Sequence, residues 1–236
     1  MNYIYFFIIV FLSTFLLKTE KLYAHKINKN EINSIIKNFI QNNPEVIENA
    51  LNKIKTSRKS EKLKKNLVYL SKIPNPKLSR KNSDVTIYEF FDYNCGYCKL
   101  VMQSLFNVYK NDKKVDIVFV EFPILSKSSL TAALTALASK NQSKYFELHS
   151  SLMKHKGKID ENVILSFAEE LNIDIEKLKK QIADKTLMDI INKNRQIANE
   201  LNIQGTPAFI IGNKIYPGAM SEDEIIEAIN VERKNK

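Results

Sequence analysis

The sequence predicts an α/β protein in which a long helical segment interrupts a β-sheet. Two apolar stretches, at 85–91 and 115–122, have the length and composition of buried strands, and a helical pattern at 95–110 lies between them. This strand–helix–strand order is typical of two parallel neighbouring strands. Residues 127–202 are then wholly helical, and a short hairpin at 208–216 follows. The sheet is therefore expected to begin before the helical segment and to be completed after it.

Five helical patterns fill the interrupting segment, and they lie at 130–139, 145–155, 161–171, 175–183 and 187–201. The hairpin pairs Ala208–Ile211 with Lys214–Tyr216 across a Gly-Asn turn. Ser221 and Glu224 have the spacing of a capping box, which predicts the start of a last helix.

Two helices are predicted before the sheet, and they form an N-terminal helical arm at 25–73. Apolar residues recur at helical spacing along both. Asn43 and Pro44 are interpreted as the cap and the first-turn proline of the second helix. An apolar helical face of this kind packs either on the main domain or against a second copy of the chain. A linker with two prolines is predicted at 74–83, where it stops the helix.

The first 17 residues are nearly all apolar, and they predict a signal peptide at 1–24. The apolar run is short for a membrane span, and Leu22-Tyr23-Ala24 offers a cleavage site after it. No lysine or arginine precedes the run, so an uncleaved membrane anchor is the alternative. Neither cysteine lies near this segment, which excludes a lipid-modified cysteine anchor. The chain is expected to leave the cytoplasm.

The composition is that of a folded, basic protein. Of the 236 residues 44% are hydrophobic, which is enough for a core, and the formal net charge is +10. A basic balance is compatible with binding to nucleic acid or to a membrane surface. The lysines, however, are scattered along predicted helices with no repeated aromatic platform between them. We interpret them as solvated helix faces and expect no nucleic-acid partner.

The only two cysteines, Cys95 and Cys98, lie in a Cys-Gly-Tyr-Cys motif between a predicted strand and a predicted helix. A structural disulfide across so short a loop would contribute only about 2 kcal/mol to stability. A metal site would need further ligands, and the three histidines show no paired spacing with the cysteines. Two accidental cysteines at this spacing would be unusual in an exported chain. The motif therefore predicts a redox pair, which itself carries the electrons and needs neither metal nor cofactor.

The spacing gives the two thiols different environments. Cys95 is expected at the start of the helix, where free backbone N–H groups and the helix dipole favour a thiolate. Cys98 lies one turn later and can attack a mixed disulfide held on Cys95. We therefore expect Cys95 to be the exposed nucleophile and Cys98 the buried resolving thiol. Gly96 and Tyr97 carry no positive charge, so the Cys95 thiolate should be less stabilised than it would be beside a histidine.

Glu89 interrupts the apolar strand at 85–91. A buried carboxylate without a partner is costly, so burial should raise its pKa. Placed beneath the cysteines, Glu89 could accept and return the proton of Cys98. The alternative is an acid at a strand edge or strand end that faces solvent.

Thr206 and Pro207 stand directly before the strand at 208–211. A proline has no N–H for the sheet ladder, so it belongs at the start of a strand or at an edge. The sequence pattern by itself leaves the cis and trans forms of this bond open.

Taken together, these motifs resemble the DsbA-like branch of the thioredoxin superfamily. The resemblance runs from about Asp84 to Ile229 and rests on the stretch 88–99 around the cysteines, on Glu121-Phe122-Pro123 and on Gly205-Thr206-Pro207-Ala208-Phe209. It implies a thioredoxin fold whose two parts, 84–126 and 203–236, enclose a helical insertion at 127–202.

The same resemblance implies the roles of the site residues. Cys95 would be the nucleophile, Cys98 the resolving cysteine and Glu89 the buried acid. Thr206 and Pro207 would form a cis-proline loop that faces the cysteines. This loop, together with Gly96 and Tyr97, would align the substrate as an added strand.

Two departures from the family pattern bear on the direction of the reaction. The central Gly-Tyr pair differs from the Pro-His of strongly oxidising members, and the N-terminal arm resembles that of ScsC-like exported proteins, some of which are oligomers. We expect a periplasmic oxidoreductase that introduces disulfides into newly exported proteins and is reoxidised by a membrane redox partner. The alternatives are an isomerase or reductase that forms a homo-oligomer through residues 31–70, and a binding protein whose cysteines are incidental.

Overall fold

The computed structural model describes residues 28–235 of the chain. The predicted signal peptide at 1–24 and His25 lie outside the described residues. Contacts between residues divide the chain into two units, one up to Lys55 and one from Thr56 onward. None of the helices between residues 28 and 235 is both long and apolar enough to cross a bilayer.

The first unit consists of helix α2 (Lys29–Asn42) and the first part of helix α3 (Pro44–Leu70). Asn28 caps α2 by accepting the backbone N–H of Glu31. Asn43 lies between the two helices, where its amide donates to the Phe39 carbonyl at 2.7 Å and its own carbonyl accepts the N–H of Val46 at 3.1 Å. Large apolar side chains are exposed along both helices, namely Ile32, Ile35, Ile36, Phe39, Ile40, Val46, Ile47, Leu51 and Ile54.

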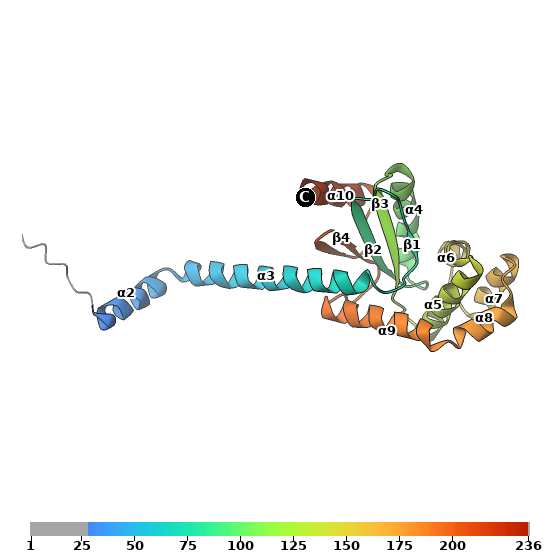
Figure 1. The fold of residues 1–236 in the computed structure, drawn as a ribbon, viewed down its shortest axis with the longest axis horizontal. Helices are drawn as coiled ribbons and strands as arrows, with labels where there is room; N and C mark the ends of the chain where they lie inside the picture. Colours follow the sequence, from blue (N-terminus) through green and yellow to red (C-terminus); the bar gives the residue numbers. More distant parts are fainter. Residues whose placement is uncertain (1–27, 236) are drawn as a thin grey trace, which may run out of the picture. The chain divides into compact units, whose positions relative to one another are not determined.

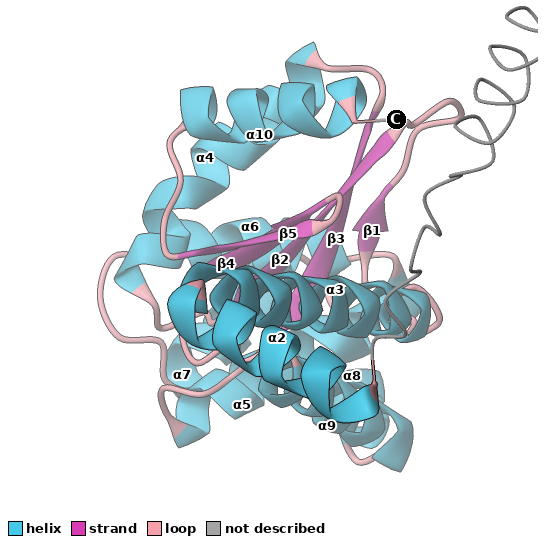
Figure 2. Cartoon of the chain, turned by 90° about the vertical axis from the view of Figure 1, so that its left-hand side faces the viewer, coloured by secondary structure: helices cyan, strands magenta, loops and turns pink. Residues whose placement is uncertain are grey.

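The second unit contains a five-stranded sheet in the order β1-β3-β2-β4-β5 (Figure 2). Its strands are β1 (Lys77–Leu78), β2 (Val85–Phe91), β3 (Val115–Glu121), β4 (Ala208–Ile211) and β5 (Lys214–Pro217). Strands β2 and β3 are parallel and the other pairs are antiparallel. The predicted strand–helix–strand unit and the predicted late hairpin are both confirmed.

Strand β1 lies inside the segment that was predicted as a linker. Lys77 and Leu78 pair with Val118 and Ile117 of β3, and the carbonyl of Pro76 accepts the N–H of Phe119 at 2.9 Å. A strand of two residues beside prolines is too short to show a period of two in the sequence. Its pairing depends on β3, which is distant along the chain.

Helices cover both faces of this sheet (Figure 1). The helices of the second unit that follow β2 are α4 (Gly96–Asn111), α5 (Lys127–Ser139), α6 (Tyr145–Lys154), α7 (Glu161–Glu170), α8 (Ile175–Ile182), α9 (Lys185–Glu200) and α10 (Glu222–Lys234), with a short 3₁₀ helix at Lys140–Gln142. One face packs against α4, α10 and the insertion helices, and this cluster contains both cysteines. The opposite face packs against α9 and the last part of α3.

Two helices pack on the sheet at the edges of predicted segments. Leu63 and Leu70 of α3, within the predicted arm at 25–73, are buried in the core of the second unit, which is one of the two arrangements expected for the apolar face of the arm. Ile197 and Ala198 of α9, at the end of the predicted insertion, pack on the same sheet face. An amphipathic pattern shows that a helix has an apolar face, but it does not show which surface covers that face.

An ionic cluster ties the end of α10 to the rest of the sheet domain. Arg233 donates to both oxygens of Asp84, which precedes β2, and its Nη1 lies 2.8 Å from Oδ2 of Asp112, the C-cap residue of α4. Hydrogen bonding from Arg233 lowers the pKa of both carboxyl groups. A carboxyl group whose pKa is lowered by folding stabilises the fold above its unfolded pKa, and this stability is lost as the pH falls through its folded pKa.

We predict that Arg233→Ala lowers the free energy of unfolding by about 1 kcal/mol at pH 7, a modest value because these side chains remain partly exposed. The difference from wild type should shrink below about pH 3.5, where both aspartates become protonated in the unfolded chain. Urea unfolding at pH 7 and below about pH 3.5 measures the free energy of unfolding of wild type and variant, with Lys234→Ala as the matched control. An equal loss at both pH values would show that Arg233 acts by packing rather than by charge.

Candidate functional site

Cys95 is the N-cap residue of the helix that follows the central strand β2. Its backbone N–H donates to the carbonyl of Asp92 at 3.0 Å, which closes a turn directly after the strand. Its Sγ accepts the backbone N–H of Cys98 at 3.4 Å, in the manner of a capping side chain. The sulfur therefore occupies the position at which free N–H groups and the helix dipole stabilise negative charge, as the spacing predicted.

Two polar side chains that the sequence analysis missed hold this turn in place. Buried Asp92 accepts N–H groups from Asn94, Ile124 and Leu125, all within 2.9 Å. The Asn94 amide group lies within 3.2 Å of three serine hydroxyls at the start of α5, and its oxygen accepts the N–H of Ile159. These bonds join the cysteine turn to the loop after β3 and to the helical insertion.

The predicted cis-proline loop lies directly beside Cys95. The Thr206–Pro207 bond is cis, as the family resemblance implied. The Cys95 thiol donates to the Thr206 carbonyl across 3.2 Å. Two segments that are more than a hundred residues apart thus meet at the sulfur atom.

Cys95 is less exposed than predicted. Its exposed fraction is 6%, against 0% for Cys98, and the two are free thiols in this structure. The Thr206 carbonyl lies 3.2 Å from the sulfur. The expectation of an exposed nucleophile is therefore wrong for the free protein, although Cys95 is still the more accessible of the two.

The pKa values of the two thiols move in opposite directions. The pKa of Cys95 is lowered to about 6, mainly by hydrogen bonding from the Cys98 thiol. Burial opposes this shift, and hydrogen bonds from the Thr206 side chain and from the backbone N–H groups of Cys98 and Tyr97 add to it. The Thr206 hydroxyl has no other hydrogen-bond partner among the described residues, so it can turn toward the thiolate. Burial raises the pKa of Cys98, and the hydrogen bond to Cys95 and the charge of Glu89 add to this effect. At neutral pH, Cys95 is the thiolate and Cys98 holds its proton.

Glu89 lies in the middle of the sheet rather than at an edge. It stands between Phe119 of β3 and Phe209 of β4, and only 1% of its surface is exposed. Its Oε1 has no hydrogen-bond partner within residues 28–235. Burial, with a smaller contribution from the nearby Cys95 charge, raises the pKa of Glu89 to about 8. A carboxyl group that titrates near neutral pH can exchange a proton.

Gly96 and Tyr97 begin helix α4 next to the cysteine. Tyr97 is 66% exposed, and nothing lies within 4 Å of the position that a Cβ on Gly96 would occupy. Leu100, Ile124 and Leu125 are also exposed large apolar residues close in sequence to the turn and to the loop that Asp92 holds. The surface around the cysteine turn therefore exposes aromatic and aliphatic groups.

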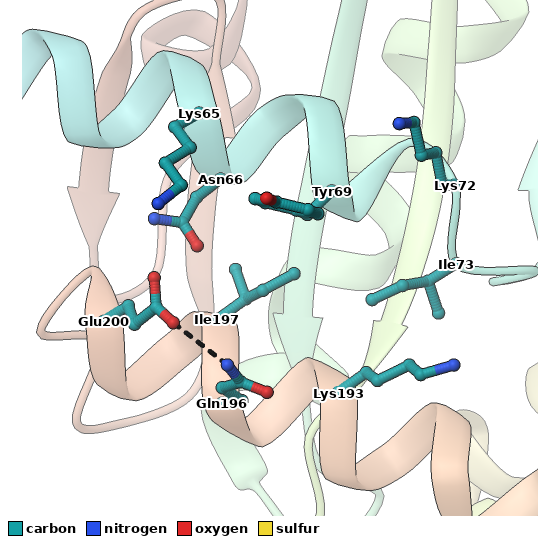
Figure 3. A pocket seen from close by; sticks show the side chains of 9 residues that line it. All are labelled: Lys65, Asn66, Tyr69, Lys72, Ile73, Lys193, Gln196, Ile197 and Glu200. Atoms are coloured by element: carbon teal, nitrogen blue, oxygen red, sulfur yellow. Dashed lines mark hydrogen bonds between the residues drawn. The ribbon is translucent and has the colours of Figure 1, made fainter.

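Two surface cavities of the second unit differ in their relation to this site. One, of about 350 Å³, includes Thr206 and Pro207 and continues along residues 201–208 to Lys59 of α3. The other, of about 490 Å³, lies between α3 and α9 (Figure 3). No predicted site residue lines the second cavity, and its Gln196 and Glu200 are hydrogen-bonded to each other. In the described part of the chain, no three His, Cys, Asp or Glu side chains gather as a metal ion would require.

Residues 75–231 match the sequence profile of the family described as thioredoxin. The chain belongs to the thioredoxin family. The match spans the sheet, the cysteine turn, the helical insertion and the cis-proline loop, so the thioredoxin fold with an inserted helical domain is confirmed.

Comparison with individual proteins supports the same branch of the thioredoxin family. A probable disulfide bond formation protein D of Bacillus cereus is 28% identical over 171 residues, which are 66% of this chain and 78% of that protein. The crystal structure of the thiol-disulfide exchange protein α-DsbA2 of Wolbachia pipientis is 28% identical, with a TM-score of 0.69, over 75% of this chain and 97% of that one. The predicted resemblance to the DsbA-like branch is confirmed.

Two further comparisons concern the length of the match. A variant of Proteus mirabilis ScsC covers 92% of this chain and 100% of its own, with a TM-score of 0.69 and 23% identity, which shows a shared fold. The Na⁺/H⁺ antiporter NhaA 1 of Salinispora arenicola is 22% identical over 63% of this chain, and the matched part is 23% of the antiporter. The chain thus spans about a quarter of the length of that curated relative.

We predict that iodoacetamide modifies the reduced protein at Cys95 and leaves Cys98 unmodified at pH 7. The Cys95 rate should follow the fraction of thiolate, with an apparent pKa of about 6, because only the thiolate is nucleophilic. Mass spectrometry of peptides across a pH series measures both sites, and the denatured protein is the control in which both react. Equal modification of Cys98 in the native protein would contradict the structural asymmetry.

Proposed function

We propose that the chain catalyses thiol–disulfide exchange in cysteine-containing proteins, with Cys95 as nucleophile and Cys98 as resolving thiol. The observation that carries the proposal is the position of the Cys95 sulfur. It caps α4 through the Cys98 N–H and lies 3.2 Å from the carbonyl of the cis-proline loop. A stabilised thiolate beside a buried, protonated thiol is the arrangement that exchange through a mixed disulfide requires.

In the oxidising direction a substrate thiolate attacks Cys95 of the Cys95–Cys98 disulfide. A bond forms between the substrate sulfur and Cys95, the bond between the two cysteines breaks, and Cys98 leaves with the electron pair. Glu89 then supplies a proton to the Cys98 thiolate. A second substrate thiolate attacks the mixed disulfide and releases Cys95 as a thiolate. The substrate loses two electrons and two thiol protons. The cysteine pair gains the two electrons, one proton replaces the one that Glu89 gave to Cys98, and the other goes to solvent because Cys95 remains a thiolate.

Thiolate stabilisation supports an oxidase. A lowered Cys95 pKa stabilises the reduced form of the pair and therefore makes its disulfide a better oxidant. The likeness to a disulfide bond formation protein points the same way. Reoxidation of the reduced pair would need an electron acceptor, for which we propose a membrane redox partner.

The substrate would lie along the cis-proline loop. Thr206 and Pro207 line a cavity, the Thr206 carbonyl lies 3.2 Å from the Cys95 sulfur, and exposed Tyr97 follows Gly96 at the start of α4. An extended segment can add to the backbone there as a further strand. The surrounding apolar side chains suit incompletely folded chains, whose own apolar residues are still exposed.

We place this reaction in the periplasm. The apolar first 17 residues, which predict export, support this location, as does the instability of protein disulfides in a reducing cytosol. The substrates would then be proteins that have just been exported and whose cysteines are still reduced.

A second candidate function is that of an oligomeric isomerase or reductase. The observation that favours it is the exposed apolar face of α2 and the first part of α3, between residues 32 and 54. A second copy of the chain could cover this face by helix–helix packing. Several active sites held together could rearrange wrong disulfides in one substrate.

We predict that the full chain catalyses disulfide formation in a reduced two-cysteine peptide and that Cys95→Ser abolishes this activity. Cys98→Ser should instead accumulate a mixed disulfide with the peptide, because the resolving thiol is absent. Peptide oxidation followed by mass spectrometry measures both effects. Unchanged activity in Cys95→Ser would show that the cysteines are incidental and that the proposed function is wrong. Efficient reactivation of scrambled ribonuclease, lost in Cys95→Ser, would favour the isomerase instead.

We predict that Phe39→Asp together with Leu51→Asp reduces the mass of the full chain in solution to that of a single chain, if the arm mediates self-association. Charges on a packed apolar face are costly to bury. Light scattering measures the mass, and Val231→Asp, on an exposed apolar residue of α10, is the matched control. If the wild type and all variants have the mass of a single chain, the hypothesis that the arm forms a homo-oligomer is wrong.

A further inference from the structure

A second buried polar cluster lies next to the cysteine turn and is not used in the mechanism above. It consists of Glu121 at the end of β3, Tyr93 in the cysteine turn, and Tyr145 and His149 on α6. No more than 3% of any of these side chains is exposed. Four titratable groups in the interior carry a substantial cost unless they satisfy one another.

The hydrogen bonds converge on one carboxyl oxygen. Glu121 Oε1 accepts the hydroxyl of Tyr93 at 3.0 Å and that of Tyr145 at 2.9 Å. Tyr93 also lies 3.1 Å from His149 Nδ1. A phenol has one proton, so when Tyr93 donates to Glu121, His149 must donate its Nδ1–H to Tyr93. A directed chain then runs from α6 through the cysteine turn to β3.

The buried surroundings favour the uncharged forms of the groups in this hydrogen-bonded cluster. Rings of Phe91 and Phe119 pack against His149, with centroids 5.1 and 4.8 Å away. Burial lowers the pKa of His149 to about 3. Burial also raises the pKa of Glu121, and the two carboxyl groups that face it, Asp92 and Glu89, raise it further against the lowering effect of the two phenols. Burial therefore favours the uncharged form of Glu121, whose Oε1 is the acceptor for both phenols.

Glu121 and Glu89 lie on the same face of the sheet. In the register of β2 and β3, Glu89 stands opposite Phe119 and Phe91 stands opposite Glu121. Side chains two residues apart on a strand share a face, so the two acids are diagonal neighbours. Tyr93 connects this position with the cysteine turn, because only Asn94 separates it from Cys95 along the chain.

We propose that Glu121 is a positioning residue for Cys95, acting through the hydroxyl of Tyr93 while Tyr145 and His149 anchor the same network to α6. The network fixes Tyr93 from two sides, from the sheet and from the insertion. It thereby fixes the turn that aims the Cys95 sulfur at the Cys98 N–H and the Thr206 carbonyl. This inference rests on the proposed function for its effect on turnover, but its effect on the Cys95 thiolate is independent of any substrate.

The test compares Glu121→Gln with Glu121→Leu in the full chain. Gln is neutral and keeps the oxygen that accepts both phenols. The acid dissociation constant of Cys95, measured by thiolate absorbance, should therefore stay within about twofold of the wild-type value. Leu removes the acceptor, so the thiolate should be destabilised about tenfold and peptide exchange should slow by a similar factor, as expected when a reacting group is misplaced. Melting temperatures show whether each variant is folded.

Two tyrosine variants separate positioning from general loss of packing. Tyr93→Phe and Tyr145→Phe each remove one of the two hydroxyl groups that donate to Glu121 Oε1. Only Tyr93 lies in the cysteine turn. Tyr93→Phe should reproduce most of the change in Cys95 pKa seen with Leu, and Tyr145→Phe should change it less. An unaltered Cys95 pKa in folded Tyr93→Phe or Glu121→Leu would overturn the proposal. Equal shifts in Gln and Leu variants would also overturn it, because Glu121 would then act through its charge.

If the wild-type protein exchanges no thiols while the Cys95 pKa still depends on Tyr93 and Glu121, the proposed function fails and the positioning role stands. The two hypotheses can therefore fail separately.

Discussion

The turn between β2 and α4 is the constraint on which the geometry of the site depends, and one carboxylate holds it. Asp92 accepts N–H groups from the turn itself and from the loop after β3, while its own carbonyl accepts the N–H of Cys95. These bonds place Cys95 at the N-cap of α4. From that position follow the contact with Cys98, the approach of the Thr206 carbonyl and the stabilisation of the thiolate. A different path of the chain at Asp92 would separate the sulfur from all three.

Three buried carboxyl groups surround the cysteines, and their hydrogen-bond partners give them different chemistry. Asp92 accepts three backbone N–H groups and is a structural anchor. Glu121 accepts two phenols at one oxygen, and burial raises its pKa. Glu89 has an oxygen without a partner, and its pKa of about 8 leaves it able to exchange a proton. Identical functional groups thus differ through the donors that the fold supplies, which is the general basis for tuning acids in active sites.

The sequence pattern predicted those features that break a local rule. A carboxylate within an apolar strand identified Glu89, and a cysteine pair between a strand and a helix identified Cys95 and Cys98. The same rule applied to Glu121, which also interrupts an apolar strand, but an acid at a strand end is ordinary at a surface. Asp92 and Asn94 gave no signal, since such residues are common in turns. Strand β1, the burial of Cys95 and the packing of the second half of α3 depend on contacts with distant segments, and no local pattern contains these.

The helical arm exposes large apolar side chains, and the physical question is what covers them. Within the second unit, Leu63 and Leu70 of α3 are buried, whereas in the first unit no residue of α2 is buried and apolar residues of α3 such as Leu51 are exposed. The apolar side chains of helix α3 are therefore buried near its C-terminal end and exposed near its N-terminal end. Exposed aliphatic side chains at helical spacing favour association, either with another copy or with an unfolded substrate. Thiolate chemistry at Cys95 is the same in both cases, and self-association would change only how many active sites one substrate meets at a time.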